Sequence, residues 1–264
     1  MCFYYAIVKV RARALIANKV VNEKQLEMFD DKYIVSGFEH PQMPVISSDK
    51  PDEIQRFYWG FVPSYIATKE KADEFVKNYN TLNAKGETVF EKQTFKEAIR
   101  KKRCLVLCSG FFEWRHRKIE GSKKVEKYPF YITLKNNEMF VFGGVWDSFT
   151  DKETGEIFHT FSIITTEANE LMEIVHNSKK RMPLIINPEK AMEWLSPELT
   201  ETQIKEFIAP FDAKQMKARP IGKINPFMLK NYDNASVTAY YQYPELMDIL
   251  SSDYFEDDTD LRQN

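Results

Sequence analysis

Short apolar runs rich in aromatic and β-branched residues recur along this chain, and they constrain its fold more than any other feature. FYYAIVKV follows the first two residues, CLVLCSGFFEW spans residues 104–114, and IFHTFSIITT begins at Ile157. Residues of these types favour β-strands, and turn-forming residues separate the runs. The sequence therefore predicts a β-rich protein in which antiparallel strands dominate.

Helical patterns are shorter and lie between the apolar runs. KEKADEFVKNY (69–79) carries charged residues on its outer positions, and TETQIKEFIAPF (200–211) opens with a Thr-x-x-Gln capping signal. Further helices are expected at 95–103, 168–176 and 188–195, which gives an α+β fold class. The expected strands cover residues 3–10, 43–47, 54–61, 104–117, 128–135, 138–149, 157–169, 181–189, 216–223 and 235–243.

The chain is predicted to form one domain followed by an acidic tail. Its 264 residues, 43% of them hydrophobic, suffice for one sizeable core. No repeat, linker or low-complexity block divides it. We expect a domain over residues 1–243 and a disordered acidic tail over 244–264, with a monomer as the default state. The charged stretch 115–127 between two strands predicts a protruding hairpin.

Charge and cysteine content bear on the partners and the cellular compartment of the protein. The 37 basic and 39 acidic residues give a net charge of −2, which neither announces nor excludes a nucleic-acid partner. Three cysteines form no disulfide framework, which favours a reducing compartment. The apolar start is interrupted by Lys9, Arg11 and Arg13, and no run approaches the roughly 20 apolar residues of a membrane span. We expect a soluble cytoplasmic protein with no membrane partner, metal or cofactor.

Cys2 is a candidate for chemistry because it directly follows the initiator Met1. Removal of Met1 leaves an α-amine and a thiol on the same residue, a combination that no internal cysteine offers. The alternative is an ordinary buried thiol. Cys104 and Cys108 share one face of a predicted strand, and core packing is the better interpretation for them because no second ligand pair accompanies them.

Three further polar residues are candidates with open alternatives. Glu113 stands in the aromatic phrase FFEW, so it is either a strand-end residue that points to water or a desolvated acid with a raised pKa. His176 ends an apolar helical segment before NSKKR, where it acts as an acid or base or caps the helix. Asn83 in LNAKGET is a turn residue or a site residue.

Six phrases in a fixed order carry a more specific message: MC, WGFVPSY, LNAKGET, RCLVLCSGFFEW, ITTEAN and IVHNSKKRMPLII. Each phrase alone is a weak signal, whereas the ordered set anchored by a cysteine at position 2 is specific. The series resembles the SRAP family, the SOS-response-associated peptidase domain of abasic-site processing proteins. The resemblance covers roughly residues 2–243.

The resemblance implies a β-rich pseudo-barrel of mostly antiparallel strands with inserted short helices and a cleft for single-stranded DNA. It also implies an enzyme of the DNA damage response that crosslinks covalently to abasic sites. The family's catalytic cysteine falls on Cys2, and the asparagine of its Asn-Ala-Arg phrase falls on Asn83. The glutamate of its Gly-Phe-Tyr-Glu-Trp phrase falls on Glu113, and the histidine before its Arg-Met-Pro phrase falls on His176.

The same resemblance suggests four DNA contacts. Lys85 replaces the arginine of the Asn-Ala-Arg phrase and Arg181 begins the Arg-Met-Pro phrase, so both are expected to contact phosphates. Tyr65, where the family often has tryptophan, and Trp59 are expected to support or stack on neighbouring bases. Core packing is an equal alternative for Trp59.

Two further departures from the family pattern are visible. Phe3 and Tyr4 follow the cysteine where the family usually has Gly-Arg, so a phosphate-binding arginine is missing. Four residues separate His176 from Arg181, which exceeds the usual spacing.

The chemistry of an abasic site explains why a cysteine at position 2 suits the proposed reaction. The open-chain sugar carries an aldehyde at C1′, which a free amine converts to an imine. An α-amine with a pKa near ~7.7–8.0 is substantially unprotonated at neutral pH, whereas a lysine near ~10.4 is not. The thiol of Cys2 then closes a five-membered thiazolidine ring. Glu113 would donate and accept protons, Asn83 would orient the amine or the sugar, and His176 would shuttle a proton.

Two other functions compete with covalent capture. One is a non-covalent reader of damaged or modified single-stranded DNA, and the other is an N-terminal-nucleophile amidohydrolase, which also begins Met-Cys. Removal of Met1 is either autocatalytic or the work of an aminopeptidase.

Overall fold

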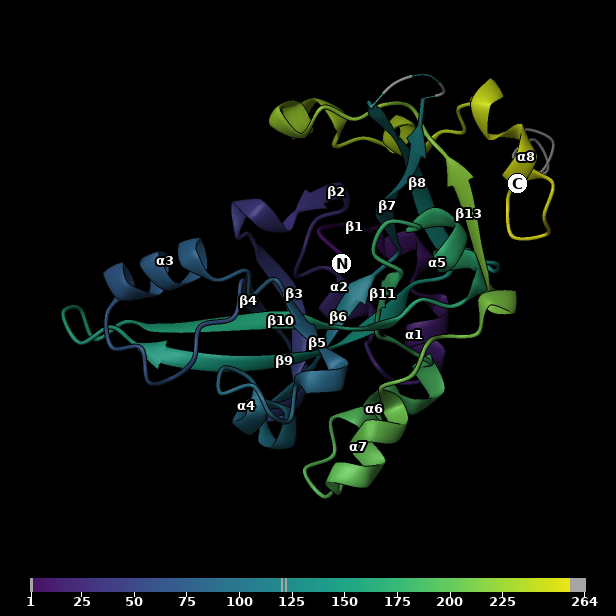
Figure 1. The fold of residues 1–264 in the computed structure, drawn as a ribbon. Helices are drawn as coiled ribbons and strands as arrows, with labels where there is room; N and C mark the ends of the chain where they lie inside the picture. Colours follow the sequence, from purple (N-terminus) through teal and green to yellow (C-terminus); the bar gives the residue numbers. More distant parts are fainter. Residues whose placement is uncertain (1, 120, 122, 257–264) are drawn as a thin grey trace.

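Two β-sheets organise the chain (Figure 1), and the computed structural model describes residues 2–119, 121 and 123–256. The first sheet has five strands in the order β13-β8-β7-β1-β2. The second has the order β11-β10-β4-β3-β6-β9-β12, with β5 joined to β10. The strands are β1 (Tyr4–Ile7), β2 (Lys32–Ser36), β3 (Gln42–Ser47), β4 (Lys50–Trp59), β5 (Asn83–Lys85), β6 (Arg103–Cys108), β7 (Gly110–Lys118), β8 (Val125–Leu134), β9 (Phe140–Thr150), β10 (Ile157–Glu167), β11 (Arg181–Pro183), β12 (Ile185–Ile186) and β13 (Met216–Pro220).

The second sheet closes on itself into a barrel. Strand β10 pairs with β4 on one side and β9 on the other, β9 pairs with β6, and β3 joins β6 to β4. Only the contacts of β10 with β4 and β5 are parallel among the described strand pairs. Tyr5 of the first sheet packs against Trp59 and Phe142 of the barrel, so one core serves both sheets. The expected α+β fold with a β-rich pseudo-barrel is confirmed.

The run 104–117 forms two strands rather than the single strand expected. Strand β6 belongs to the barrel and β7 to the five-stranded sheet, and the chain changes sheets at Ser109. The Ser109 amide donates to the Ala6 carbonyl (2.8 Å), and its Oγ accepts from the Val8 amide (2.7 Å). These bonds hold the chain next to β1 at the point where it passes from one sheet to the other. The hydrophobic periodicity of the sequence does not indicate this break. Cys104 and Cys108 are fully buried, which confirms their core interpretation.

Short helices cover the sheets, and the Thr200–Gln203 capping box predicted for residues 200–211 is present. Helices α1 and α2 form in a segment for which no helix was expected from the sequence. No helix in the described part of the chain combines the length and apolar character needed to cross a membrane. The α-helices are α1 (Arg13–Ala17), α2 (Glu23–Leu26), α3 (Lys69–Asn78), α4 (Lys96–Lys101), α5 (Glu170–Val175), α6 (Ala191–Trp194), α7 (Glu201–Phe207) and α8 (Met247–Leu250). The 3₁₀ helices are η1 (Lys9–Arg11), η2 (Gly37–Glu39), η3 (Gly86–Thr88), η4 (Pro188–Lys190), η5 (Ala213–Gln215), η6 (Pro226–Tyr232), η7 (Ala235–Thr238) and η8 (Pro244–Leu246).

The carboxyl-terminal region differs from expectation in two places. Residues 235–238 form η7 rather than a strand, since Asn234 caps the turn through its side chain. Residues 244–256 are ordered rather than disordered: Phe255 bridges to Ala218 of β13, and Glu256 is buried. Cationic side chains on β13 compensate the buried carboxylate, which composition does not reveal. The rest of the expected tail, 257–264, lies outside the described residues.

Candidate active site

Strands β1 and β7 place Cys2 near Glu113. The two strands are antiparallel, with Tyr4 opposite Phe112 and Tyr5 opposite Phe111. Cys2 precedes β1 and Glu113 follows Phe112, so both lie at the same end of this strand pair. The negative charge of Glu113 contributes to the raised pKa of the Cys2 thiol, which agrees with this proximity.

Cys2 is held inside the protein at the start of β1. Its exposed fraction is 0%, and its carbonyl accepts a hydrogen bond from Asn83 Nδ2 (2.9 Å). The thiol donates to the Tyr4 carbonyl at 3.8 Å. Burial, followed by the charge of Glu113, raises the pKa of this thiol far above its ordinary value, so it is neutral near pH 7. The structure thus brings together Cys2, Asn83 and Glu113.

Glu113 and His176 lie close together and are both buried. Glu113 Oε2 lies 3.7 Å from His176 Nε2, and the two residues are 5% and 6% exposed. His176 Nδ1 lies 2.9 Å from the Arg181 carbonyl, and since a carbonyl only accepts, Nδ1 carries the proton and Nε2 faces Glu113 as an acceptor. Burial raises the pKa of Glu113 to about 7 and lowers that of His176 to about 4. Near neutral pH, Glu113 therefore gains and loses a proton while His176 stays neutral.

His176 is positioned by α5 and by the residue that follows it. Asn169 caps α5 by accepting from the Met172 amide (2.9 Å), and His176 ends the helix as predicted. Asn177 then accepts from the His116 amide and donates to the His116 carbonyl, both at 2.9 Å. Asn177 thus bonds to the backbone of β7 as a neighbouring strand would. Its partner His116 lies three residues after Glu113. The sequence analysis did not select Asn177, although its place directly after the candidate His176 could have indicated a supporting role.

The segment around Asn83, expected to be a loop, contains the short strand β5. Asn83 lies opposite Ile163 and Lys85 opposite Thr165, in parallel register with β10. Asn83 therefore reaches Cys2 from a fixed strand, and Lys85 is exposed. Pairing with β10 overrides the turn-like composition of this segment.

Arg181 is already engaged by a carboxylate. Its guanidinium forms a two-pronged ion pair with Glu87, with Nη2 to Oε2 at 2.9 Å, and also donates to the Thr165 carbonyl at 2.8 Å. Burial alone would raise the pKa of Glu87, but hydrogen bonds from Arg181 and the charge of Lys85 lower it on balance. Glu87, which sequence reasoning did not select, therefore stays ionised between two cations.

The two aromatic candidates differ. Tyr65 is 60% exposed on the segment after β4. Trp59 is 0% exposed, donates from Nε1 to the Leu82 carbonyl (2.9 Å) and packs 5.1 Å from Tyr5. The expectation that Trp59 stacks on bases is wrong, because core packing covers its faces, and the alternative core interpretation is confirmed.

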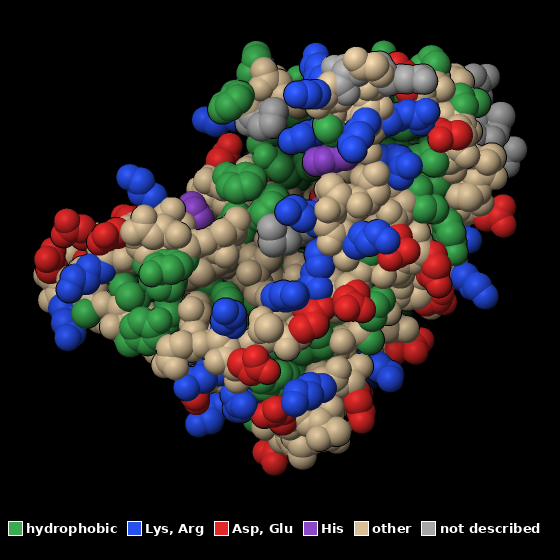
Figure 2. All heavy atoms as spheres, viewed as in Figure 1, with side chains coloured by type: hydrophobic (Ala, Val, Ile, Leu, Met, Phe, Trp, Pro, Cys, Tyr) green, Lys and Arg blue, Asp and Glu red, His purple; other side chains and the backbone are tan. Residues whose placement is uncertain are grey.

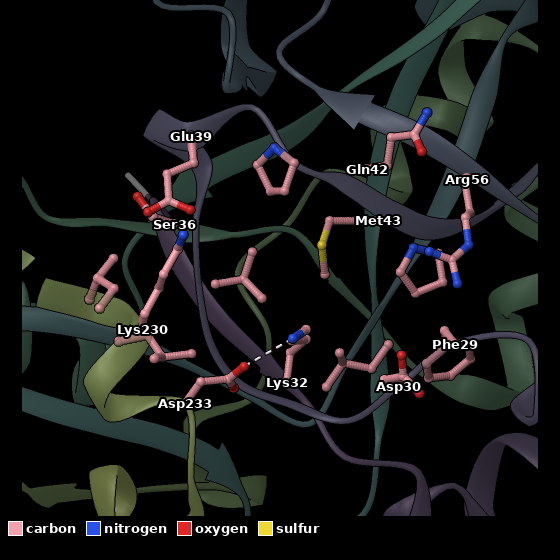
Figure 3. A pocket seen from close by; sticks show the side chains of 16 residues that line it. Phe29, Asp30, Lys32, Ser36, Glu39, Gln42, Met43, Arg56, Lys230 and Asp233 are labelled. Carbon is pink, nitrogen blue, oxygen red and sulfur yellow. Dashed lines mark hydrogen bonds and ion pairs between the residues drawn. The ribbon is translucent and has the colours of Figure 1, made fainter.

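A separate cavity of about 260 Å³ lies beside β2 (Figure 3). One ion pair lies within its wall: Lys32 Nζ lies 3.0 Å from Asp233, and Asp233 also accepts from the Tyr33 amide (2.8 Å). Within the described residues, no group of three or more His, Cys, Asp or Glu side chains is arranged to hold a metal ion. The arrangement with distinctive proton chemistry is therefore that of Cys2, Glu113 and His176.

Comparisons with known proteins agree on the family. A model described as SOS response associated peptidase (SRAP) matches residues 1–224. The abasic site processing protein YoqW of Bacillus subtilis (strain 168) is 30% identical over 210 residues, which cover 75% of this chain and 87% of the relative. The abasic site processing protein HMCES of Gallus gallus is 28% identical over 192 residues, covering 65% of this chain and 53% of that protein. The crystal structure of a protein from Bacteroides thetaiotaomicron matches with a TM-score of 0.78 and 37% identity, covering 91% of this chain and all (100%) of the other. The chain therefore belongs to the SOS response associated peptidase family.

Proposed function

We propose that this protein processes abasic sites in DNA and captures them covalently through Cys2. The observation that carries the proposal is the position of Cys2 beside a buried carboxyl group whose pKa is raised to about 7. Relatives named as abasic site processing proteins support the choice of substrate. Single-stranded DNA is the form that we expect to be bound, because the aldehyde must reach a buried terminus.

The reaction begins after Met1 has been removed. The free α-amine of Cys2 attacks C1′ of the open-chain sugar, a C–N bond forms, and the carbonyl oxygen leaves as water to give an imine. The thiol then adds across the C=N bond: sulfur bonds to C1′ and the thiol proton moves to nitrogen. Ring closure is intramolecular, so it benefits from a high effective concentration. The step needs no external proton, because sulfur releases its proton as nitrogen gains one.

Glu113 is the proton carrier of this scheme. With a pKa of about 7, it is present in both protonation states at neutral pH, which favours general acid and base catalysis. It donates a proton to the departing oxygen and recovers one from the attacking amine. Neutral His176, with Nε2 3.7 Å from Glu113 Oε2, packs beside the carboxyl group, and Asn83 donates a hydrogen bond to the Cys2 carbonyl.

Cationic side chains would receive the phosphates on either side of the lesion. On the face drawn in Figure 2, Lys and Arg side chains gather near β1 and β11 of Figure 1. Lys85 is exposed there, whereas Arg181 must exchange Glu87 for a phosphate before it can contribute. Tyr65 remains a candidate for stacking on a base.

The test is a denaturing gel of the protein with a single-stranded oligonucleotide that carries one abasic site, beside an undamaged control. The intact mass of the protein is recorded first to establish whether Met1 is absent. We expect a band that survives heat and detergent with abasic DNA only, and its loss in Cys2→Ala. Cys104→Ala is the matched control because Cys104 is equally buried and should leave the band unchanged. A persistent band in Cys2→Ala would reject the mechanism, and retention of DNA without any band would favour a non-covalent reader.

A further inference from the structure

A row of aromatic rings borders Cys2. The ring of Phe3, the next residue, lies 4.8 Å from that of Phe38, which in turn lies 6.0 Å from the ring of Tyr4. Tyr4 makes an edge contact with Trp114 at 5.1 Å. Phe38 is 54% exposed although it has aromatic neighbours on one side. We call Phe3, Tyr4 and Phe38 the aromatic shelf.

The turn that carries Phe38 is rigid. The Gly37 amide donates to the Phe3 carbonyl (2.8 Å), and the Phe38 amide donates to Ser36 Oγ (3.3 Å). A Cβ atom on Gly37 would lie 3.1 Å from the Trp59 ring, so this turn packs closely on the core. These contacts hold the backbone that carries Phe38 next to the start of β1.

We propose that the aromatic shelf receives the base of the nucleotide that flanks the abasic site. This inference rests on the proposed function, because binding of the abasic sugar next to Cys2 is what places the flanking nucleotide there. An abasic nucleotide lacks its base, so the neighbouring base loses a stacking partner on one side. The shelf replaces that missing partner with protein rings, and stacking of this kind accepts any base because every base has a π-face.

Continuity with Cys2 identifies a base as the occupant. Phe3 is one residue from Cys2, about 3.8 Å along the backbone, so a strand attached to Cys2 through C1′ has its next base within reach of the shelf. The shelf is neutral and aromatic, which suits a base, whereas the exposed Lys85 suits a phosphate. Purines have the larger π-face, so the shelf favours a purine beside the lesion.

The test separates stacking from covalent chemistry. The probe is a single-stranded oligonucleotide with a tetrahydrofuran abasic analogue, which has no aldehyde, and with fluorescent 2-aminopurine on its 5′ or 3′ side. We expect the wild-type protein to quench 2-aminopurine on one side. Phe38→Ala should lose that quenching and bind about ten-fold more weakly, in line with the value of one stacked base. Phe38→Trp should restore both.

Tyr241→Ala is the matched control. Tyr241 is 53% exposed and packs 4.7 Å from Tyr243, so it resembles Phe38 in exposure and ring contact. Its amide donates to the carbonyl of Pro220 in β13. Strands β13 and β2 form the two edges of the five-stranded sheet, so they lie roughly 19 Å apart at the usual strand spacing. This variant should bind and quench as the wild type does.

A double-mutant cycle that combines Phe38→Ala with a change of the flanking base tests whether the two interact directly. Replacing the flanking purine with a pyrimidine should weaken binding by the wild type and leave Phe38→Ala almost unaffected. Equal affinity and quenching in wild type and Phe38→Ala would overturn the shelf, even if the wild type forms its heat-stable adduct. If instead quenching depends on Phe38 but no adduct ever forms with a true abasic site, covalent capture fails and the shelf stands.

Discussion

Two buried carboxylates, Glu113 on the central strand β7 and Glu256 beside the edge strand β13, have different surroundings in the five-stranded sheet. Both are less than a tenth exposed. Glu256 contacts Lys217 and lies 3.0 Å from Arg219, so two cations hold its charge. Glu113 lies 3.7 Å from a histidine whose pKa is lowered to about 4, and its own pKa is raised to about 7. Burial is common to both, and the partner decides whether a carboxylate fastens the fold or carries protons.

The largest expected effect is on the structural side of this comparison. Glu256→Gln leaves two nearly buried cations without their counter-charge, so we expect a loss of about 3–5 kcal/mol in the free energy of unfolding. Urea unfolding of the wild type and the variant measures it. Adduct formation by the folded variant should be unchanged. A change below about 1 kcal/mol would show that the cations find other partners.

The second effect is on rate. Glu113→Gln keeps the shape of the side chain but removes its titration, so we expect adduct formation to slow by about 100-fold, a typical contribution of general acid–base catalysis. Rapid quenching and denaturing gels give the rate, and anisotropy gives DNA affinity, which should stay within about two-fold. An equal loss of rate and affinity would mean that Glu113 only supports the fold.

The third effect is the pH dependence of stability, which has opposite signs for the two members of the pair. The folded pKa of Glu113, about 7, exceeds the unfolded value near ~4.3, so its contribution is present at low pH and is lost as the pH rises through 7. The folded pKa of His176, about 4, is below the unfolded value near ~6.5, so its contribution is present above that value and is lost as the pH falls through 4.

Urea unfolding between pH 4.5 and 7.5 tests these signs. Glu113→Gln should remove a downward slope of up to about 1.4 kcal/mol per pH unit, and His176→Gln should remove an upward one. Parallel curves for both variants and the wild type would contradict the opposed titration of the pair.

The smallest effect is that of Asn177, whose side chain bonds to β7 rather than to Glu113 or the His176 ring. Asn177→Ala removes two hydrogen bonds to β7, so we expect a stability loss of about 1 kcal/mol. Because His176 then loses its fixed distance from Glu113, the rate should fall several-fold and the pKa seen in the pH–rate profile should move toward that of an ordinary carboxylate. Ser178→Ala, one residue further on, is the control. A stability loss with an unmoved profile would leave Asn177 a purely structural clamp.

Local sequence patterns and the family resemblance predicted most strands and the candidate site residues. Strand-forming runs gave most strands, and the ordered phrases gave Cys2, Asn83, Glu113 and His176, the first three of which contact or influence one another as the site requires. Prediction from the sequence failed where tertiary partners decide. The break at Ser109 depends on hydrogen bonds to β1, and the order of residues 244–256 depends on cations of β13. The burial of Trp59 and the engagement of Arg181 by Glu87 likewise depend on residues distant along the chain.

Strand β1 lies between β2 and β7, with hydrogen-bonded partners on both sides. Chain ends normally fray, and their amides exchange with solvent through small local openings. Opening β1 requires both ladders to break, so its amides should exchange as slowly as those of the central barrel strands. Under the proposed function, the reacting residue Cys2 therefore precedes a strand whose amides are expected to open as rarely as those of the core.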